Sequence, residues 1–438
     1  MARPDRAYGP IPTVSRTEDD GTLVELVYDP AARTTVLAVR TRTGAIEMRS
    51  DLMLATGEQL VPYSPRNSLI ASGCVLLPSD IGDFGDKGEL VGAVRAFIHR
   101  YVDLSPSFED IATYYVLLTW VYDAFGELPY LRFRGDWGTG KTRALLTIGS
   151  LCYKPFFASG ASTVSPIFHI LDTFRGTLVL DEADLRFSDA TAELTKILNN
   201  GTVAGLPVLR TMTNRAQELD PRAFNVFGPK LLGMREHFAD RALESRFLTE
   251  ETGQRPLRPD ISISLPRSLA TDARALRNRL LAWRFDARHT VAIEPDRIVG
   301  DIAPRLNQTA IALLSIIDDA NIRDGLAAVL VREDERFGSE RAASAEFTVL
   351  SALVTVALRT PGRAIPLGDI ARTLSRKIAG NLQGSLSSRA IGYVIRTKLR
   401  LPTVKSKGVF VIPALSRPAI MALAARYGVD VPPHAPDA

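Results

Sequence analysis

From Thr22 onward, apolar residues gather in short runs that are typical of β-strands. Turn-forming pairs such as Asp29-Pro30 separate these runs, as expected between short strands. The irregular composition of residues 1–20 predicts a disordered arm, and the short apolar runs predict a small β-rich module over residues 21–85. The predicted strands are Leu23–Tyr28, Thr35–Val39 and Ala45–Met48.

From residue 86 onward apolar residues recur at intervals of three and four residues, as in helices that bury one face. We expect a helical linker region over residues 86–127. Strand and helix signals then alternate over residues 128–265, which predicts an α/β core with a parallel sheet. A helical period resumes over residues 266–340 and predicts a helical lid. The longest apolar stretch, Ile111–Tyr122, is too short to span a bilayer, so we expect no membrane association.

The last third of the sequence predicts a helix, a strand, two more helices and a hairpin, followed by a disordered tail over residues 428–438. This is the element order of a winged helix-turn-helix over residues 345–415, a motif whose third helix enters the major groove of DNA. The predicted elements are Phe347–Arg359, Ile365–Leu367, Asp369–Ile378, Ser387–Leu399, Leu401–Val404 and Val409–Ile412.

The distribution of charged residues supports the interpretation of this module as a DNA-binding domain. Ten Lys or Arg and one acidic residue give residues 361–410 a net charge of +9, whereas the whole chain carries +4, so the rest of the chain is net negative. A local excess of this kind favours a polyanionic partner. The alternatives are a solvated basic face and a protein-docking role. The expected DNA contacts are Arg389, Arg396 and Lys398 on the third helix and Lys405 and Lys407 on the wing.

Composition excludes several classes of protein. A chain of 438 residues with 46% hydrophobic and 23% charged residues is globular and long enough for several domains. Two cysteines, Cys74 and Cys152, are too few for a disulfide framework or a cysteine-rich zinc site. With no apolar leader at the start, the protein is expected to be cytoplasmic. Five scattered histidines predict no metal site beyond the one a nucleotide brings.

Residues 135–142 match the phosphate-binding pattern G-x-x-x-x-G-K-S/T between a predicted strand, Tyr130–Arg134, and a predicted helix. Glycines in such a loop let backbone N–H groups turn inward and cradle phosphate oxygens. We expect ATP here, with Lys141 reaching the β- and γ-phosphates and Thr142 binding Mg²⁺. The nucleotide-binding residues are Gly135, Asp136, Trp137, Gly138, Thr139, Gly140, Lys141 and Thr142.

Two details of the surrounding strands complete the candidate site. The strand before the loop carries Arg132 and Arg134, which is unusual in a central parallel strand, so we expect both to pair with nearby acids. About 40 residues after the loop, an apolar strand ends in Asp181-Glu182. We expect Asp181 to hold the metal ion, and Glu182 to orient and deprotonate an attacking water. A glutamate at this position favours hydrolysis over simple nucleotide binding.

The order of these features continues with a polar-ended apolar strand at residues 230–236 and an Ala-Leu-x-Ser-Arg-Phe segment at residues 242–247. The order resembles the AAA+ ATPase core, and in particular the MCM-like and superfamily-3-like replicative helicases of phages, plasmids and chromosomal cassettes. The resemblance implies that Arg246 is an arginine finger directed at ATP in a neighbouring subunit, with Arg241 as the alternative. It places Arg235 near the first sensor position. Candidates for a second sensor are Arg274, Arg277 and Arg279.

The resemblance also implies a hairpin that grips DNA in a central channel. Two β-like runs, Pro207–Met212 and Phe224–Phe227, flank a polar turn at the matching place. Arg210 and Arg215 are the cations available there. The alternative is a surface hairpin without a ligand.

Together these features predict an ATP-dependent DNA helicase or translocase. The resemblance implies that it serves a mobile element or phage and acts as a homo-oligomeric ring, expected to be a hexamer. It would hold single-stranded DNA in the channel and duplex or fork DNA at the basic module. The alternative is an ATP-switched initiator, helicase loader or regulator that binds DNA without unwinding it. A DNA-packaging or defence ATPase is a third hypothesis.

Overall fold

The computed structural model divides the chain into two compact units, Met1–Val329 and Leu330–Ala438. Among the residues that it describes, no helix is both long enough and apolar enough to cross a membrane. The expected arm before residue 9 and the expected tail after residue 430 lie outside these residues. The described ranges are 9–160, 162–183, 189–213, 218–238, 240–342, 344–378, 388–406 and 408–430, without the side chains at 189–191, 340–342, 376–378 and 388.

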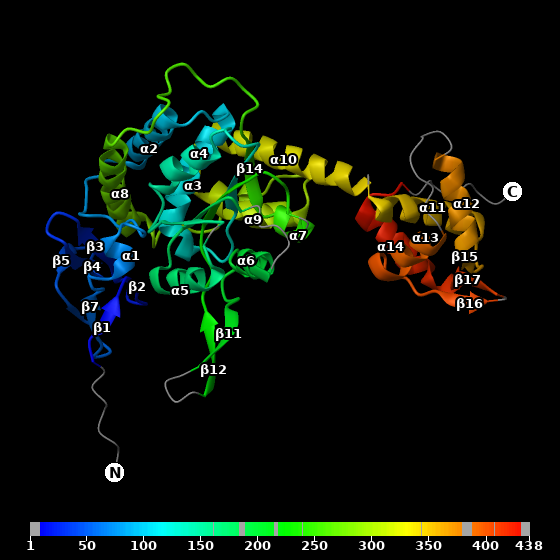
Figure 1. Cartoon of the computed structure of the whole chain (residues 1–438), viewed down its shortest axis with the longest axis horizontal. Helices are drawn as coiled ribbons and strands as arrows, with labels where there is room; N and C mark the ends of the chain where they lie inside the picture. The colour runs from blue at the N-terminus through cyan, green and yellow to red at the C-terminus, as the bar shows by residue number, and fades with distance from the viewer. Residues whose placement is uncertain are drawn as a thin grey trace, which may run out of the picture. The chain divides into compact units, whose positions relative to one another are not determined.

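Two small sheets and a short helix, α1 (Ser68–Ala71), form the N-terminal module (Figure 1). The expectation of a disordered arm up to residue 20 is wrong from Ile11 onward, because two short strands here pair with later parts of the module. Val14, between these strands, is only 5% exposed and belongs to the core. One sheet contains β2 (Ser15–Thr17), β3 (Leu23–Asp29), β4 (Thr34–Arg40) and β5 (Ile46–Arg49), and the other contains β1 (Ile11–Thr13), β7 (Gln59–Pro62) and β6 (Leu52–Met53).

A five-stranded sheet forms the centre of the first unit, and every neighbouring pair of its strands is parallel. This confirms the predicted α/β core with a parallel sheet. The strand before the phosphate-binding loop at residues 135–142 (the P-loop) is β8, and it lies between β13 and β14. The carboxyl ends of parallel strands share one edge, which positions the candidate nucleotide site. In spatial order the strands are β14 (Phe247–Glu251), β8 (Tyr130–Arg134), β13 (Lys230–Met234), β10 (Leu178–Asp181) and β9 (Phe156–Ser159).

Helices cover both faces of this sheet. Val179 of β10 faces α4, where a Cβ on Gly149 would approach it to 2.9 Å. Its neighbours Leu178 and Leu180 point the other way, into a core shared with α5, α6 and the N-terminal module. The predicted linker helices are α2, capped by Asp86, and α3, which is apolar on nearly every side and buried. The helices are α2 (Lys87–Tyr101), α3 (Pro106–Val121), α4 (Lys141–Gly149), α5 (Val164–Phe174), α6 (Asp189–Asn200) and α7 (Arg241–Glu244).

The predicted hairpin is present, and it projects from the first unit (Figure 1). It consists of β11 (Val208–Thr213) and β12 (Leu219–Phe224), so the second strand begins five residues earlier than the expected Phe224. Val208 and Phe224 are buried at its base, which fixes the register.

The region predicted as a lid is helical, with α8 (Ser268–Ala287), α9 (Pro304–Ile316) and the start of α10 (Ala320–Ala342). α8 packs against α2 and α3, and α9 packs against α3.

The second unit has a core of its own. A three-stranded antiparallel sheet with the order β15-β17-β16 packs with its helices. The predicted helices and strands are present, except that the strand expected at Leu401–Val404 is found at Val404–Ser406 and shares only Val404 with that range. The unit also extends beyond the expected boundary at residue 415, because Ile420 and Ala424 of a further helix are fully buried in this core. The elements are α11 (Ala345–Arg359), β15 (Ile365–Pro366), α12 (Leu367–Ile378), α13 (Ser388–Tyr393) with a π-helical turn (Val394–Lys398), β16 (Val404–Ser406), β17 (Val409–Ile412) and α14 (Arg417–Tyr427).

Candidate nucleotide site

The predicted phosphate-binding loop joins the end of β8 to the start of α4. Gly138 and Gly140 have φ angles of 79° and 92°, a left-handed backbone that favours glycine. Gly140 is also the N-cap of α4. A helix N-terminus presents unsatisfied N–H groups and a positive dipole end, so the loop is suited to an anion such as a nucleotide phosphate.

The lysine of the loop lies back over the loop itself. The Lys141 Nζ donates hydrogen bonds of 2.6 Å to the carbonyl oxygens of Gly135 and Asp136. The ammonium group is therefore at the mouth of the phosphate cradle. Trp137 at the tip of the loop is 82% exposed.

The metal-binding residues predicted from two separate motifs meet at this edge of the sheet. Thr142 Oγ1 donates a hydrogen bond of 2.6 Å to Asp181 Oδ2, and Asp181 Oδ1 accepts one of 2.9 Å from the backbone N–H of Glu182. Hydroxyl and carboxylate oxygens are the ligands that Mg²⁺ prefers, so this pair fits a nucleotide-bound Mg²⁺. No cluster of three or more His, Cys, Asp or Glu side chains suited to a metal occurs in the described ranges.

Two backbone features hold the acidic pair in place. Gly233 on the adjacent strand has no room for a side chain, since a Cβ there would lie 2.8 Å from both Asp181 Oδ1 and Leu145 Cδ1. Glu182 adopts φ of 54°, a left-handed conformation that costs a residue other than glycine about 1 kcal/mol or more. Glu182 is exposed, so its carboxylate is accessible to water at the phosphate-binding edge.

The two arginines of β8 pair with acids, as expected. The fully buried Arg132 donates two hydrogen bonds of 2.7 Å to the Glu244 carboxylate. Its guanidinium carbon also lies 4.8 Å from the centre of the Phe247 ring. Arg134 pairs with Glu251 on β14. Burial alone would raise the pKa of Glu244, but the Arg132 hydrogen bonds and charge, with smaller contributions from His237 and the Phe238 amide, lower it to about 2.

No motif in the sequence marks the residues that brace the loop from the side. Thr252, directly after β14, donates from its backbone N–H to the Arg134 carbonyl oxygen at 2.7 Å, and its hydroxyl lies 2.8 Å from that of Thr139. A Cβ on Gly135 would lie 2.5 Å from Thr252 Oγ1, and one on Gly253 would lie 2.4 Å from Thr139 Cγ2. Close packing of β14 against the loop therefore requires these two glycines.

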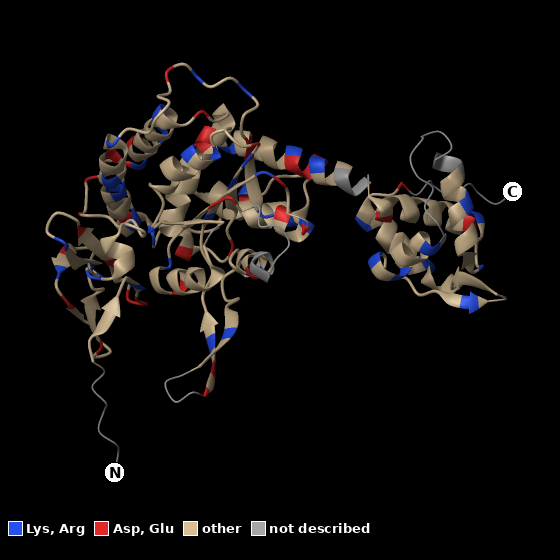
Figure 2. Cartoon of the chain, viewed as in Figure 1, with Lys and Arg blue, Asp and Glu red and all other residues tan. Residues whose placement is uncertain are grey.

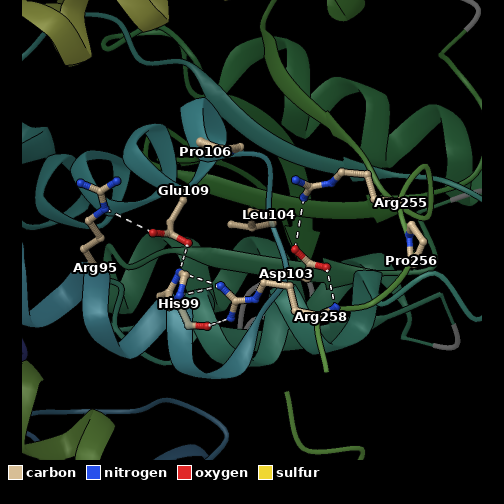
Figure 3. A pocket seen from close by; sticks show the side chains of 9 residues that line it. All are labelled: Arg95, His99, Asp103, Leu104, Pro106, Glu109, Arg255, Pro256 and Arg258. Atoms are coloured by element: carbon tan, nitrogen blue, oxygen red, sulfur yellow. Dashed lines mark hydrogen bonds and ion pairs between the residues drawn. The ribbon is translucent and has the colours of Figure 1, made fainter. Parts of the chain in front are cut away.

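A cavity of about 450 Å³ opens beside the loop, where a nucleotide base and ribose have room. One wall is the segment after β14, which Arg255 holds against Asp103, between α2 and α3, by an ion pair. Figure 3 shows this contact around an adjoining cavity of about 390 Å³, together with the ion pairs of Glu109 with Arg95 and His99, which join α3 to α2. The cavity beside the loop is lined by Val102, Asp103, Leu104, Gly138, Thr139, Gly140, Arg143, Ala144, Glu250, Glu251, Thr252, Gly253, Gln254, Arg255, Leu257 and Ile263.

The finger candidate lies at the opposite edge of the sheet. The Arg246 carbonyl accepts a hydrogen bond of 2.9 Å from the backbone N–H of Tyr130, which is the first residue of β8. The P-loop follows Arg134, the last residue of the same strand. Arg246 Nη1 donates to the carbonyl oxygens of Leu198, at 3.3 Å, and Asn199 near the end of α6. The two ends of this five-residue strand lie about 13 Å apart, so the Arg246 side chain does not face the P-loop of its own subunit. The other finger candidate, Arg241, begins α7 near this edge.

The sensor candidates separate into two groups. Arg235 follows Met234, which pairs with Arg134, so it lies exposed at the phosphate-binding edge. In contrast, Arg277 is 5% exposed and donates to the Ser150 carbonyl at 2.6 Å. Arg279 donates to the Phe84 carbonyl at 3.2 Å. None of the three second-sensor candidates, Arg274 included, is among the described residues that line the cavity beside the loop.

The predicted DNA contacts of the first unit are only partly described. Arg215 lies outside the described residues. Arg210 lies near the root of the hairpin, where it pairs with Glu193 and stacks 4.2 Å above the Phe168 ring. Arg222, opposite Arg210 on β12, is exposed and was missed by sequence reasoning.

In the second unit, Arg389, Arg396, Lys398 and Lys405 are all exposed. Lys407 lies outside the described residues.

Comparison with known proteins gives structural matches only. No family model matches the sequence, and no curated protein matches it. The C-terminal region of NrS-1 aligns with 89% of this chain and 96% of its own, at 11% identity and a TM-score of 0.37. An MCM homolog from Methanopyrus kandleri aligns over 69% of each chain, at 11% identity and a TM-score of 0.37. Cch of SCCmec type IV, described as an active helicase, aligns with 94% of this chain and 95% of its own, at 11% identity and a TM-score of 0.32. At these identities and TM-scores, the geometry of the site has to carry any conclusion on function.

Proposed function

We propose that this chain is an ATP-dependent DNA helicase or translocase that acts as a hexameric ring in the cytoplasm, in replication of a phage or mobile element. One observation carries the proposal. Lys141, Thr142 and the Asp181-Glu182 pair meet at one edge of the parallel sheet, while Arg246 lies at the other. A subunit arranged in this way has the parts for ATP hydrolysis but does not direct its own finger at its own nucleotide.

In this proposal the backbone N–H groups of the loop and the Lys141 ammonium bind the phosphates of ATP. Thr142 and Asp181 would hold Mg²⁺, which would neutralise the charge that develops on the phosphates. Glu182 orients a water for in-line attack on the γ-phosphorus and accepts its proton, while the bond from the γ-phosphorus to the bridging oxygen breaks and ADP leaves. Glu182 is exposed and its backbone N–H, not its carboxylate, is bonded to Asp181, so one residue can serve the metal and the other the water.

Arg246 is proposed to reach the γ-phosphate bound by the next subunit and to stabilise the transition state there. Its present hydrogen bonds, to two carbonyl oxygens of α6, are contacts that it can exchange for a phosphate when subunits assemble. With Arg246 acting in this way, the site would be complete only in an oligomer.

For the second unit we propose a winged helix-turn-helix that binds DNA. The strand order β15-β17-β16 with α11, α12 and α13 agrees with that motif. Exposed cations on α13 and its π-helical turn, and on β16, are available to phosphates.

Steady-state ATP turnover with and without single-stranded DNA tests the proposal, with Glu182→Gln as the inactive reference. We expect turnover that single strands stimulate, and a loss of about 10³-fold or more in Arg246→Ala with nucleotide binding retained. Mixing Arg246→Ala with Lys141→Ala subunits should restore part of the activity, because each variant supplies what the other lacks. Full turnover by Arg246→Ala alone would exclude the finger role.

The hairpin favours a second candidate, the ATP-switched initiator or regulator. The charges of its described residues cancel, because Glu218 and Asp220 oppose Arg210 and Arg222, and Arg210 is already paired with Glu193. If Arg215→Ala and Arg222→Ala leave single-strand binding and unwinding unchanged, the channel role has no support. Turnover that ignores single strands while duplex DNA still binds would favour the switch.

A further inference from the structure

Few of the aromatic rings that the structure describes are exposed to solvent. Among these described side chains, Trp137 at 82%, Tyr393 at 55% and Phe410 at 50% are at least half exposed. Trp137 belongs to the phosphate-binding loop. Tyr393 and Phe410 both belong to the second unit, on α13 and β17. Large exposed rings on a small unit with a core of its own require an explanation, because burying them would stabilise the fold.

These rings lie among exposed arginines. Ile391, Val394 and Ile395 turn one side of α13 and the following turn into the core. Arg389, Tyr393 and Arg396, at intervals of four and three residues, form a stripe on the opposite, exposed side. The guanidinium carbon of Arg396 lies 5.9 Å from the centre of the Phe410 ring, so the stripe continues onto the hairpin.

The backbone is adapted to this arrangement. A π-helical turn over Val394–Lys398 ends α13, and such turns are rare and frequent at functional sites. A Cβ on Gly392 would lie 3.1 Å from Arg396 Nη1, so the guanidinium folds back over the helix at this glycine. Lys405 is the cross-strand partner of Phe410 and places a further cation beside the ring.

The charges around the stripe are almost all positive. Asp369, the one acidic residue among residues 361–410, pairs with Arg372. Figure 2 shows Lys and Arg spread over the hairpin and helices of this unit, with few acidic residues. A surface on which aromatic rings alternate with cations matches the chemistry of a strand with unpaired bases, whose phosphates bind the cations and whose bases stack on the rings.

We propose that the stripe Arg389–Tyr393–Arg396–Phe410 binds single-stranded DNA by stacking unpaired bases on Tyr393 and Phe410. Duplex DNA is the poorer partner, because its base faces are already stacked on each other. This inference rests on the proposed DNA-binding role of the second unit, and it assigns that role to the unpaired strand at a fork rather than to groove recognition.

The test uses the full chain without nucleotide. Fluorescence anisotropy would measure binding of an oligothymidine of about 20 nucleotides, an abasic strand of equal length and a matched duplex. The double variant Tyr393→Ala/Phe410→Ala is compared with Tyr393→Phe/Phe410→Tyr, which keeps both rings. Leu415→Ala is the control for removal of an exposed apolar side chain, since Leu415 is 92% exposed in the same unit.

We expect the double alanine variant to bind oligothymidine more weakly, by about 5-fold or more for each ring removed. Binding should recover in the ring-preserving variant. The abasic strand and the duplex should bind equally to all variants. An unchanged affinity for oligothymidine, or an equal loss on the abasic strand or the duplex, would overturn the stacking site.

Photo-crosslinking separates this site from other DNA contacts of the chain. A strand that carries 5-iodouracil should crosslink to Tyr393 or Phe410, and crosslinks confined to the first unit would refute the proposal. Binding data of this kind do not depend on hydrolysis. If single strands fail to stimulate ATP turnover while the stacking results hold, the motor proposal fails and the stacking site remains.

Discussion

Arginine has opposite roles in the two units of this protein. In the first unit, Arg132 and Arg284 are at most 2% exposed, and each holds a carboxylate through two or more hydrogen bonds. In the second unit, Arg389 and Arg396 are exposed. A buried arginine cross-links segments that are distant in the sequence, whereas an exposed one attracts an external anion. The same residue type therefore serves packing in one unit and is available for the proposed recognition of DNA in the other.

The buried arginines also join functional parts. Arg132 binds Glu244, which lies two residues before the finger candidate. Glu244 also contacts His237, which bonds Arg134, and the Arg134 carbonyl accepts from Thr252 beside the P-loop. The strand that carries the P-loop is thus linked through hydrogen bonds to the segment that carries Arg246.

Removing Glu25 should produce the largest effect on stability. Its buried carboxylate binds Lys154 at 2.7 Å and Arg284 at 2.8 Å, and so ties the N-terminal module to the core. In Glu25→Gln two buried cations lose this counter-charge, and we expect a loss of about 3–5 kcal/mol in the free energy of unfolding. Urea denaturation measures this, with the exposed Glu47→Gln as control. A loss below about 1 kcal/mol would show that the network is not structural.

Acid titration of Glu244 should give the next largest effect. Its pKa is lowered to about 2 from the usual 4.5, so it stabilises the fold above pH 4.5 and loses that contribution as the pH falls toward 2. The shift corresponds to about 3 kcal/mol.

The matched control for this titration is Arg132→Met/Glu244→Leu, in which an apolar pair replaces the ion pair. This double variant should fold at pH 7, and its free energy of unfolding should lack the contribution of Glu244 to the pH dependence. Chemical denaturation across this pH range measures both proteins. Identical pH profiles would contradict the assignment.

The smallest effect on stability should come from the exposed arginines. Arg389→Ala/Arg396→Ala should change the free energy of unfolding by less than about 0.5 kcal/mol. The same variant should reduce the slope of log affinity for single strands against log salt by about 0.7 for each phosphate that is no longer bound. A large drop in stability with an unchanged salt slope would make these arginines structural and remove the contrast between the units.

Local motifs made the central part of the site predictable. The P-loop and the Asp181-Glu182 strand are contiguous patterns, and parallel pairing brings their ends to one edge of the sheet. Thr252 was not predictable, because its contact with Thr139 joins residues 113 apart and no motif marks it. Nor could the sequence select Glu244 as the partner of Arg132, since several acids lie on neighbouring segments.

Short elements account for the other differences. β1 and β2 contain three residues each, too few to show a period, and their partners are set by the tertiary fold. The further helix α14 follows the predicted wing, and its burial depends on the core of the second unit rather than on any local signal.

The exposed tip of the P-loop gives this protein a built-in optical reporter. Of its three tryptophans, Trp120 is 0% exposed and Trp283 is 2% exposed, so acrylamide should quench little of their emission. Trp137 is 82% exposed. A nucleotide that orders or covers the loop should therefore change the quenchable fraction of the intrinsic fluorescence, so binding of ATP can be tested in the unlabelled protein.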